Sequence, residues 1–271
     1  MRQATGNAVR AESPIAADAV LAPDARAALV VAHPGHELRL HAWVARVRPE
    51  VHVLTDGAGS LGTSRVASTA RVLDDAGASA GTIFGRWSDR ALYTAILDRD
   101  HAPFLRLADE LAARLVARDV QHVVGDAAEG YNPGHDACRL VIDCAVARTG
   151  RAITRWDYPL VGRPDEPIGP GDVARLALAP ADVARKLTIA EGYPDLVGEV
   201  DHARRTWGDA AFEHECLRRL DDDAPWAPAD GVVPFYEQFG EYQVAAGAYA
   251  RVLRHREHMM PLAEALAAHA R

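Results

Sequence analysis

The chain has 271 residues, which is enough for one large domain or for one domain with a modest annex. Its net charge is −8 and its basic residues form no stripe, so we expect no nucleic-acid partner. No apolar run approaches the roughly 18 residues that a membrane-spanning helix needs, so we expect no membrane partner. Three cysteines without a CxxC pair favour a reducing compartment, and we predict a cytoplasmic protein.

Apolar runs of strand length alternate with longer segments of helical period, which is the pattern of a parallel sheet covered by helices. Residues 1–26 contain no continuous apolar core, and we expect them to form a flexible N-terminal arm. The expected strands are residues 27–32, 51–55, 80–84 and 120–125, and the expected helices are residues 37–47, 64–76, 89–97, 103–117 and a helix that runs through Val146.

The pattern changes after Arg151. Strand-like pieces at residues 153–161 and 173–178 are followed by helical segments at residues 180–191, 199–220 and 261–270. We predict an α/β fold, a Rossmann-like, doubly wound, mostly parallel sheet with helices on both faces and a C-terminal helical extension. Residues 27–271 would form a single domain in which residues 165–271 are an extension that covers the cleft.

Two histidine clusters follow two of the predicted strands. The run AHPGHE (residues 32–37) comes after the first strand, and the run YNPGHD (residues 131–136) comes after the fourth. A histidine beside a proline in a loop is commonly a turn residue, but both loops lie where open α/β sheets bind ligands. The neutral imidazoles of His33, His36 and His135 suit Zn²⁺ with a fourth position for water, and other divalent transition metals stay open.

The first cluster resembles the AHPDDE signature of the PIG-L/LmbE family, zinc-dependent deacetylases of N-acetylglucosamine-containing substrates, and the second resembles that family's HPDH motif. The resemblance covers about residues 27–200. It implies that His33 takes the first ligand position, His36 the position of the family's aspartate ligand, and His135 the last histidine position. It also implies that Arg65 and Asp89 read polar groups of the substrate.

The departures from that signature concern acid–base catalysis. The family's general base is Gly35 here, the aspartate before the final ligand is Gly134, and the histidine that helps to polarise the substrate carbonyl is Asn132. General acid–base catalysis contributes about 10²–10⁴-fold. Either another carboxylate therefore acts as the base, or the reaction is not a standard deacetylation.

Four residues beside the clusters are candidates for catalysis. Asp56 ends the second strand and could replace the base, although a turn residue that binds its own backbone explains it as well. Glu37 begins a helix, where the helix dipole favours a carboxylate, and is a second candidate. Asn132 and Tyr131 can donate hydrogen bonds to a developing oxyanion.

Two other segments carry functional patterns. Residues 57–62 match GxGxxG, but this loop follows the second strand and the chain has no Tyr-x-x-x-Lys pair, because Lys186 is its only lysine. We therefore expect no nicotinamide cofactor. The aromatic-rich residues 234–242 either pack over the cleft and contact substrate or form a subunit interface in a homo-oligomer.

We predict a metal-dependent hydrolase with zinc as its cofactor, which is deacetylase-like and cleaves an amide C–N bond of a polar or sugar-bearing small molecule through a metal-bound hydroxide. Two alternatives stay open. One is a metal-dependent, non-hydrolytic biosynthetic enzyme on the same fold, which catalyses a rearrangement or C–N bond formation. The other is a non-catalytic descendant that binds a small ligand.

Overall fold

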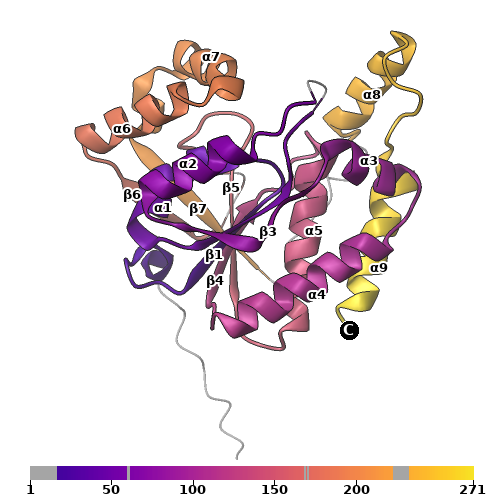
Figure 1. The fold of residues 1–271 in the computed structure, drawn as a ribbon, viewed down its shortest axis with the longest axis horizontal. Coiled ribbons are helices and arrows are strands. Elements are labelled where there is room, and N and C mark those ends of the chain that lie inside the picture. The colour runs from indigo at the N-terminus through magenta and orange to yellow at the C-terminus, as the bar shows by residue number, and fades with distance from the viewer. Residues whose placement is uncertain (1–16, 60–61, 168, 170, 222–231) are drawn as a thin grey trace, which may run out of the picture.

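Within the part of the chain that the structure describes, a seven-stranded sheet has the order β3-β2-β1-β4-β5-β7-β6 (Figure 1). The computed structural model describes residues 17–59, 62–167, 169, 171–221 and 232–271. Strands β3 to β5 pair in parallel, and β7 pairs antiparallel with both β5 and β6. The strands are β1 (Ala27–Val31), β2 (Glu50–Thr55), β3 (Ser79–Trp87), β4 (His122–Asp126), β5 (Thr154–Tyr158), β6 (Val173–Ala177) and β7 (His214–Leu220).

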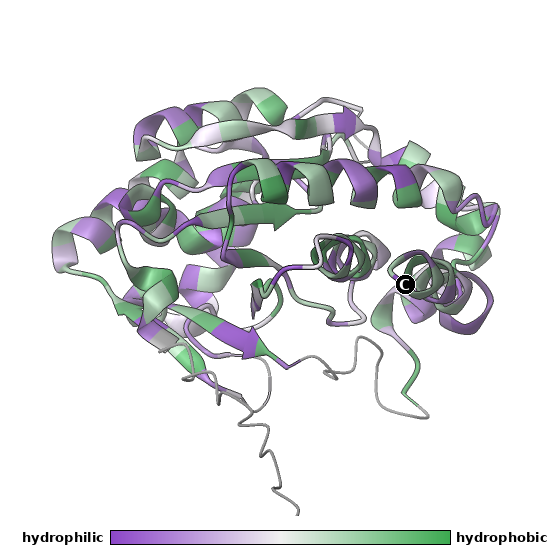
Figure 2. Ribbon diagram, turned by 90° about the horizontal axis from the view of Figure 1, so that it is seen from below, coloured by the Kyte–Doolittle hydropathy of each residue, from purple (hydrophilic) through white to green (hydrophobic). Residues whose placement is uncertain are grey.

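The central strand β1 is buried on both faces, which explains its continuous apolar sequence. Ala28 and Val30 point into one hydrophobic cluster, whereas Leu29 and Val31 point into the other. This alternation follows from the period of two along a strand. In Figure 2 the strand in the middle of the molecule is mostly green, and the helices around it alternate between purple and green.

Helices cover both faces of the sheet. One face packs against α1 (His41–Val47) and α2 (Val66–Ala76). The other packs against α3 (Asp89–Leu97), α4 (Ala102–Ala117), α5 (Pro133–Arg148) and α9 (Met260–His269). The remaining helical elements are α6 (Pro180–Glu191), α7 (Val197–Trp207), α8 (Phe235–Ala245), the 3₁₀ turns η1 (Ala17–Leu21), η2 (His36–Leu40), η3 (Pro194–Leu196) and η4 (Asp209–Phe212), and the π-helical turn η5 (His255–Met259).

The predicted fold class is confirmed, but the predicted helix over residues 199–220 is wrong in its second half. Helix α7 ends at Trp207, and Gly208 follows with a φ of 73°, a left-handed value that favours glycine. The chain then enters β7, where Cys216 and Leu217 are buried and Arg218 pairs with Asp157 of β5. Tertiary pairing on both edges of β7 overrides the local helical pattern.

The two ends of the predicted domain also have structural roles. Val20 of η1 is fully buried, and its carbonyl accepts a hydrogen bond from Trp43 Nε1 at 2.8 Å. The arm expected over residues 1–26 is therefore packed over its last part, while residues 1–16 lie outside the described residues. Strands β6 and β7 join the sheet, so the segment after residue 165 is part of the same core. None of the described helices is long and apolar enough to cross a membrane.

Candidate functional site

The two predicted histidine clusters meet at one edge of the sheet. His33 follows β1, His36 begins η2, and His135 lies in the first turn of α5. The centroid of the His33 ring lies 5.4 Å from that of His36 and 5.4 Å from that of His135. The centroids of the His36 and His135 rings are 4.6 Å apart. All three rings contact one another edge to face. They meet because β1 and β4 are parallel neighbours, so that the carboxyl ends of both strands lie at the same edge of the sheet.

The ring of His33 is oriented by two residues from other strands and helices. Its Nδ1 lies 2.9 Å from Asp89 Oδ1 and 2.8 Å from Thr55 Oγ1. The Thr55 hydroxyl donates to the Ala32 carbonyl at 3.0 Å, and a carboxylate can only accept, so His33 Nδ1 carries the proton. The opposite nitrogen, Nε2, is buried without a partner among the described residues.

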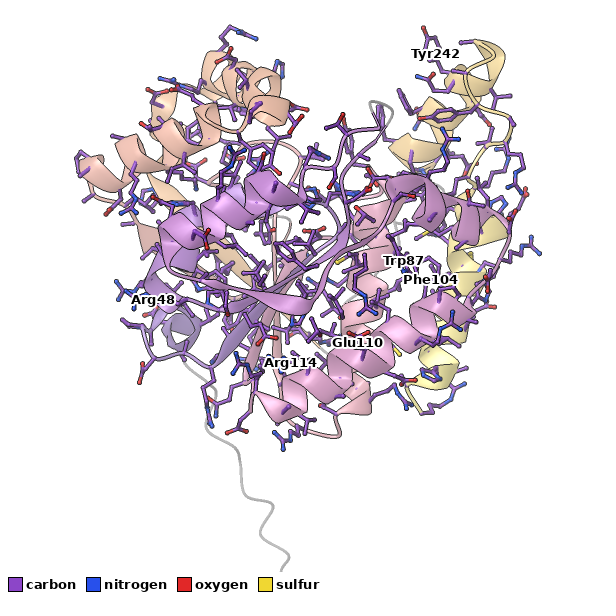
Figure 3. The ribbon with its side chains drawn as sticks, in the orientation of Figure 1. Arg48, Trp87, Phe104, Glu110, Arg114 and Tyr242 are labelled. Atoms are coloured by element: carbon purple, nitrogen blue, oxygen red, sulfur yellow. The ribbon has the colours of Figure 1, made fainter. Side chains whose placement is uncertain are left out.

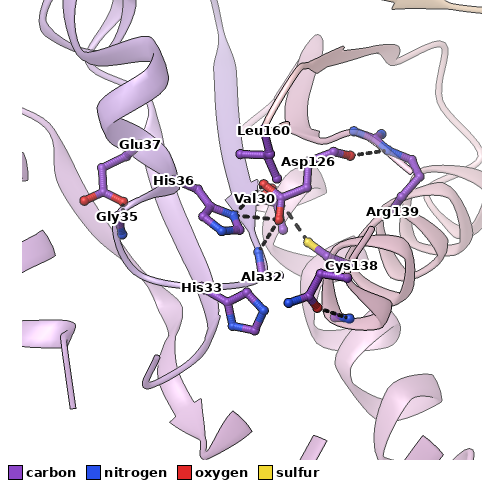
Figure 4. A network of polar contacts seen from close by, with 12 residues as sticks. Val30, Ala32, His33, Gly35, His36, Glu37, Asp126, Cys138, Arg139 and Leu160 are labelled. Carbon is purple, nitrogen blue, oxygen red and sulfur yellow. Dashed lines mark hydrogen bonds and ion pairs between the residues drawn. The ribbon is translucent and has the colours of Figure 1, made fainter. Parts of the chain in front are cut away.

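His36 is oriented in the same way by a different carboxylate. Its Nδ1 lies 3.0 and 2.9 Å from the two carboxylate oxygens of Asp126, which ends β4 (Figure 4). Asp126 is completely buried and also accepts a hydrogen bond from the Ala32 amide at 2.7 Å. Burial lowers the pKa of His36 below its ordinary value, although Asp126 opposes the shift. Asp126 is not among the site residues predicted from the sequence.

His135 has no such support. Its Nδ1 is buried without a partner among the described residues. Burial and the other two imidazoles hold the pKa of His135 well below its ordinary value, so the ring is neutral. The preceding Gly134 permits the close approach, since a Cβ there would lie 2.8 Å from His33 Nε2.

A left-handed turn at Gly35 separates the two histidines of the first cluster. Its φ is 104°, and a Cβ at this position would lie 2.3 Å from Leu196 Cδ1. The Gly35 amide donates to Glu37 Oε2 at 2.8 Å, which closes the turn. Glycine is therefore required here by the backbone conformation.

The two candidates for a replacement base make hydrogen bonds within the chain. Glu37 lies on the opposite side of the loop from Asp126 (Figure 4), and its other oxygen accepts the Thr69 hydroxyl at 2.8 Å. Burial raises the pKa of Glu37 to about 7. Asp56 Oδ1 accepts the Ala58 amide at 3.0 Å, which is a turn contact. Their catalytic role stays a prediction.

The two candidates for oxyanion stabilisation differ in burial and in contacts. Asn132 caps α5, since its Oδ1 accepts the Gly134 amide at 2.7 Å, and the same atom accepts the Tyr93 hydroxyl at 3.1 Å. This arrangement leaves the Asn132 amide group available as a donor. Tyr131 is 44% exposed, and its ring stacks on that of Phe235.

The two residues expected to read substrate have contacts within the chain. Arg65 Nε donates to the Gly57 carbonyl at 2.6 Å. Asp89 Oδ2 accepts the Gly59 amide at 2.6 Å, while its Oδ1 faces His33. Burial alone would raise the pKa of Asp89, but the hydrogen bonds to it hold that pKa well below its usual range. Asp89 therefore connects the loop after β2 to the histidine cluster.

The imidazole nitrogens of the cluster are suitable ligands for a divalent transition metal, but their positions in this structure do not form a metal site. In the described ranges, no group of three or more His, Cys, Asp or Glu side chains is arranged to hold a metal ion. Two of the three rings nevertheless donate Nδ1–H to a carboxylate, as metal-bound histidines commonly do. Two ring nitrogens are buried with no partner among the described residues, one on His33 and one on His135. Such atoms are costly unless something binds them.

Comparisons with known proteins support the fold. No protein-family model and no curated protein matches the chain in sequence. The zinc inhibited form of teicoplanin deacetylase Orf2 is similar in structure, with a TM-score of 0.54, 15% identity and coverage of 73% of this chain and 100% of that one. The complex of a deacetylase from the teicoplanin biosynthesis pathway with bog has a TM-score of 0.53, 18% identity and the same coverage.

A third similar structure is A40926 pseudoaglycone deacetylase Dbv21, with a TM-score of 0.53, 17% identity and coverage of 74% of this chain and 98% of that one. The matched part is thus nearly the whole of each of these three proteins. At such low identity the likeness establishes a shared α/β architecture. Whether an activity is shared depends on the residues of the site.

Proposed function

We propose that this protein is a divergent, metal-dependent amide hydrolase of the PIG-L/LmbE type, in which His33, His36 and His135 hold a divalent ion, zinc first among the candidates. The observation that carries the proposal is the pair of carboxylate–imidazole contacts, Asp89 to His33 and Asp126 to His36. Each contact fixes its ring with Nδ1–H turned to the carboxylate, so the other nitrogen can act as a ligand.

The spacing of the rings is compatible with a shared ion. The ring centroids lie 4.6 to 5.4 Å apart, so His33, His36 and His135 would hold one divalent ion between them if their ring nitrogens turned toward a common point. His135 Nδ1 has no hydrogen-bond partner among the described residues, so this ring is free of the contact that fixes the other two.

Side chains of this protein would orient the substrate and help to polarise its carbonyl group. A divalent metal at this position supplies Lewis acidity, which polarises an amide carbonyl and makes water more acidic. Asn132 is held by α5 and by Tyr93, so its amide group is positioned to donate to a carbonyl oxygen. Arg65 begins α2, where its remaining guanidinium donors can contact polar groups of the substrate.

A second candidate function follows from the missing base. Gly35 occupies the position that the resemblance gives to the family's general base, and both candidate replacements accept hydrogen bonds from groups of the chain. The same observation favours a metal-dependent enzyme that does not hydrolyse amides but catalyses a rearrangement or C–N bond formation. The two candidates share the histidine site and differ in the need for an activated water.

Metal analysis of the purified chain tests the shared part of these proposals. We expect about one equivalent of a divalent transition metal, and we expect it to be lost in His135→Ala. His202→Ala is the matched control, because His202 is exposed on α7. Circular dichroism would show that both variants fold. A folded His135→Ala variant that keeps a full equivalent of zinc would contradict the proposal.

Activity assays separate the two candidates. Hydrolysis of a panel of N-acetylated sugars by the metal-loaded chain, lost in the His135→Ala variant, supports the amide hydrolase. Full metal occupancy without release of acetate from any member of the panel favours the non-hydrolytic enzyme. A chain that binds sugars but no metal would point to the third alternative, a ligand-binding protein.

A further inference from the structure

Four aromatic rings form a continuous row that begins beside the candidate site. Tyr131 stacks on Phe235 with centroids 4.7 Å apart and an angle of 4° between the ring planes. Phe235 stacks on Phe239 at 5.9 Å and 24°, and Phe239 meets Tyr249 edge to face at 6.4 Å. We refer to Tyr131, Phe235, Phe239 and Tyr249 as the aromatic shelf.

The aromatic shelf is exposed rather than part of the core. The exposed fractions are 44% for Tyr131, 46% for Phe235, 41% for Phe239 and 50% for Tyr249. Helix α8 turns its buried residues, Tyr236 and Gly240, to the rest of the molecule. A contiguous group of exposed aromatic side chains commonly marks a binding site.

The aromatic shelf is hydrogen-bonded to the loop that precedes α5, the helix of His135. The Phe235 amide donates to the Gly130 carbonyl at 2.8 Å, which joins the start of α8 to this loop. Tyr131 follows Gly130 and precedes Asn132, whose side chain contacts Tyr93. The rings of Tyr93 and His33 are 6.5 Å apart. One hydrogen bond and one ring contact therefore lead from the residue after Tyr131 to the histidine cluster.

Tyr242 also belongs to α8 and lies at the outer end of that helix (Figure 3). Its side chain is 69% exposed, and its ring is not one of the stacked rings of the shelf.

We propose that the aromatic shelf binds a planar aromatic ring of the substrate, stacked on Tyr131, while the amide of the same molecule lies at the histidine cluster. This proposal rests on the proposed function and adds a substrate class to it. One face of the Tyr131 ring stacks on Phe235 and the side chain is 44% exposed, and we assign the other face to the ring of the substrate. A parallel stack favours a flat, apolar group over a charged or puckered one.

Two glycosides of N-acetylglucosamine test the proposal. The phenyl and cyclohexyl glycosides carry the same amide and a ring of the same size, and only the phenyl ring is planar. Calorimetry on the purified full chain measures both affinities. We expect the phenyl glycoside to bind about 3- to 10-fold more tightly, which is the range of one aromatic pair.

Substitutions on the aromatic shelf separate stacking from general apolarity. We expect Tyr131→Leu to remove the preference for the phenyl glycoside and Tyr131→Phe to keep it. Tyr242→Ala is the matched control, because Tyr242 lies on α8, is 69% exposed and is not one of the stacked rings of the shelf. It should leave the preference unchanged.

Three results would overturn the proposal. The first is equal affinity for the two glycosides, and the second is no binding of either. The third is a dimer in sedimentation that dissociates in Phe239→Ala, because a second copy of the chain would then cover the shelf. A clear preference for the phenyl glycoside in a chain that hydrolyses no amide would instead refute the proposed hydrolase and leave the aromatic subsite standing.

Discussion

Asp126 Oδ2 and His36 Nδ1 lie 2.9 Å apart, and the same carboxylate oxygen accepts the Ala32 amide at 2.7 Å. This completely buried carboxylate therefore connects the end of β1 to the ring of His36. Its contact with Nδ1 keeps that imidazole oriented.

Replacing Asp126 should weaken metal binding without removing the ligands. Asp126→Asn keeps an oxygen for the Ala32 amide but loses the charge that polarises His36. We expect metal affinity to fall about 10- to 100-fold. Competition with a chelator would measure the change, and Asp182→Asn, at an exposed position on α6, is the control. Unchanged affinity would show that Asp126 has only a structural role.

An aspartate at position 35 should destabilise the protein. Gly35 has a φ of 104°, so a side chain there costs about 1–3 kcal/mol of free energy of unfolding through backbone strain. A Cβ would also contact Leu196 Cδ1. Urea denaturation of Gly35→Asp measures the loss. Leu196→Ala in addition should recover only the steric part.

Gly150 provides the matched control for that experiment. Its φ is 62° and no other group lies within 4 Å of the place that a Cβ would take, so Gly150→Ala reports backbone strain alone. A Gly35→Asp variant as stable as the parent chain would show that the turn adapts easily. In that case a gain of deacetylase activity would become a fair test of a lost base.

The stability of the protein should depend on pH through His52. Burial lowers the pKa of His52 to about 4, so between pH 6.5 and 4 the unfolded chain binds a proton that the folded chain does not. The contribution of His52 is fully present above pH 6.5 and is lost as the pH falls through 4. The slope is at most about 1.4 kcal/mol per pH unit.

Denaturation of His52→Leu across this pH range measures the effect. We expect the variant's free energy of unfolding to fall less steeply with acid than that of the parent chain. Glu50 and Arg114 face the same ring from its own strand and from α4, so their charges stay as background in both chains. His202→Ala should keep the parent slope, and identical slopes for His52→Leu would refute the assignment.

Lys186 and Glu215 form an ion pair that holds the segment carrying His36. Their side chains are 4% and 1% exposed, and Lys186 Nζ lies 2.7 Å from Glu215 Oε1. Lys186 also donates to the carbonyl of Arg39 in η2, and Glu215 accepts the Ala42 and Trp43 amides at the start of α1. Lys186→Met should cost about 3–5 kcal/mol, because it leaves a buried carboxylate unpaired.

A surface pair at the preceding position provides the control for Lys186→Met. Arg185 pairs with Asp75, and their side chains are 54% and 39% exposed. Arg185→Met should cost no more than about 1 kcal/mol. Urea denaturation compares the two variants, and adding Glu215→Gln to Lys186→Met should recover part of the loss. Equal losses for Lys186→Met and Arg185→Met would mean that burial does not strengthen the pair.

The part of the fold that the sequence predicts is the part with strong local patterns. Strands β1, β2, β3 and β4 are predicted by apolar runs, and helix α3 begins and ends where its period indicates. Strand β7 is different, because its three consecutive buried residues, Glu215 to Leu217, are followed by the partly exposed Arg218 and Arg219, so its burial does not alternate as in a regular strand. Its conformation depends on pairing with β5 and β6, which no local window contains.

The residues of the site also divide into those that the sequence predicts and those that it does not. Both histidine clusters follow from their place after neighbouring strands, and the structure brings their rings together. Asp126 also ends a strand at this edge, and that position was the available signal for it. The partner of His33 could not be identified, because Asp89 is 56 residues away along the chain and meets it only in the folded state.

The reactivity of the single lysine of the chain can be used to measure the separation of α6 from η2, the turn that carries His36. Since Lys186 is the only side-chain amine and is 4% exposed, an acylating reagent can modify it only when α6 separates from η2. The labelling rate at position 186 would therefore report how often the histidine-bearing turn opens, with no engineered probe. Protection of that amine by an added ligand would show that binding keeps α6 and η2 together.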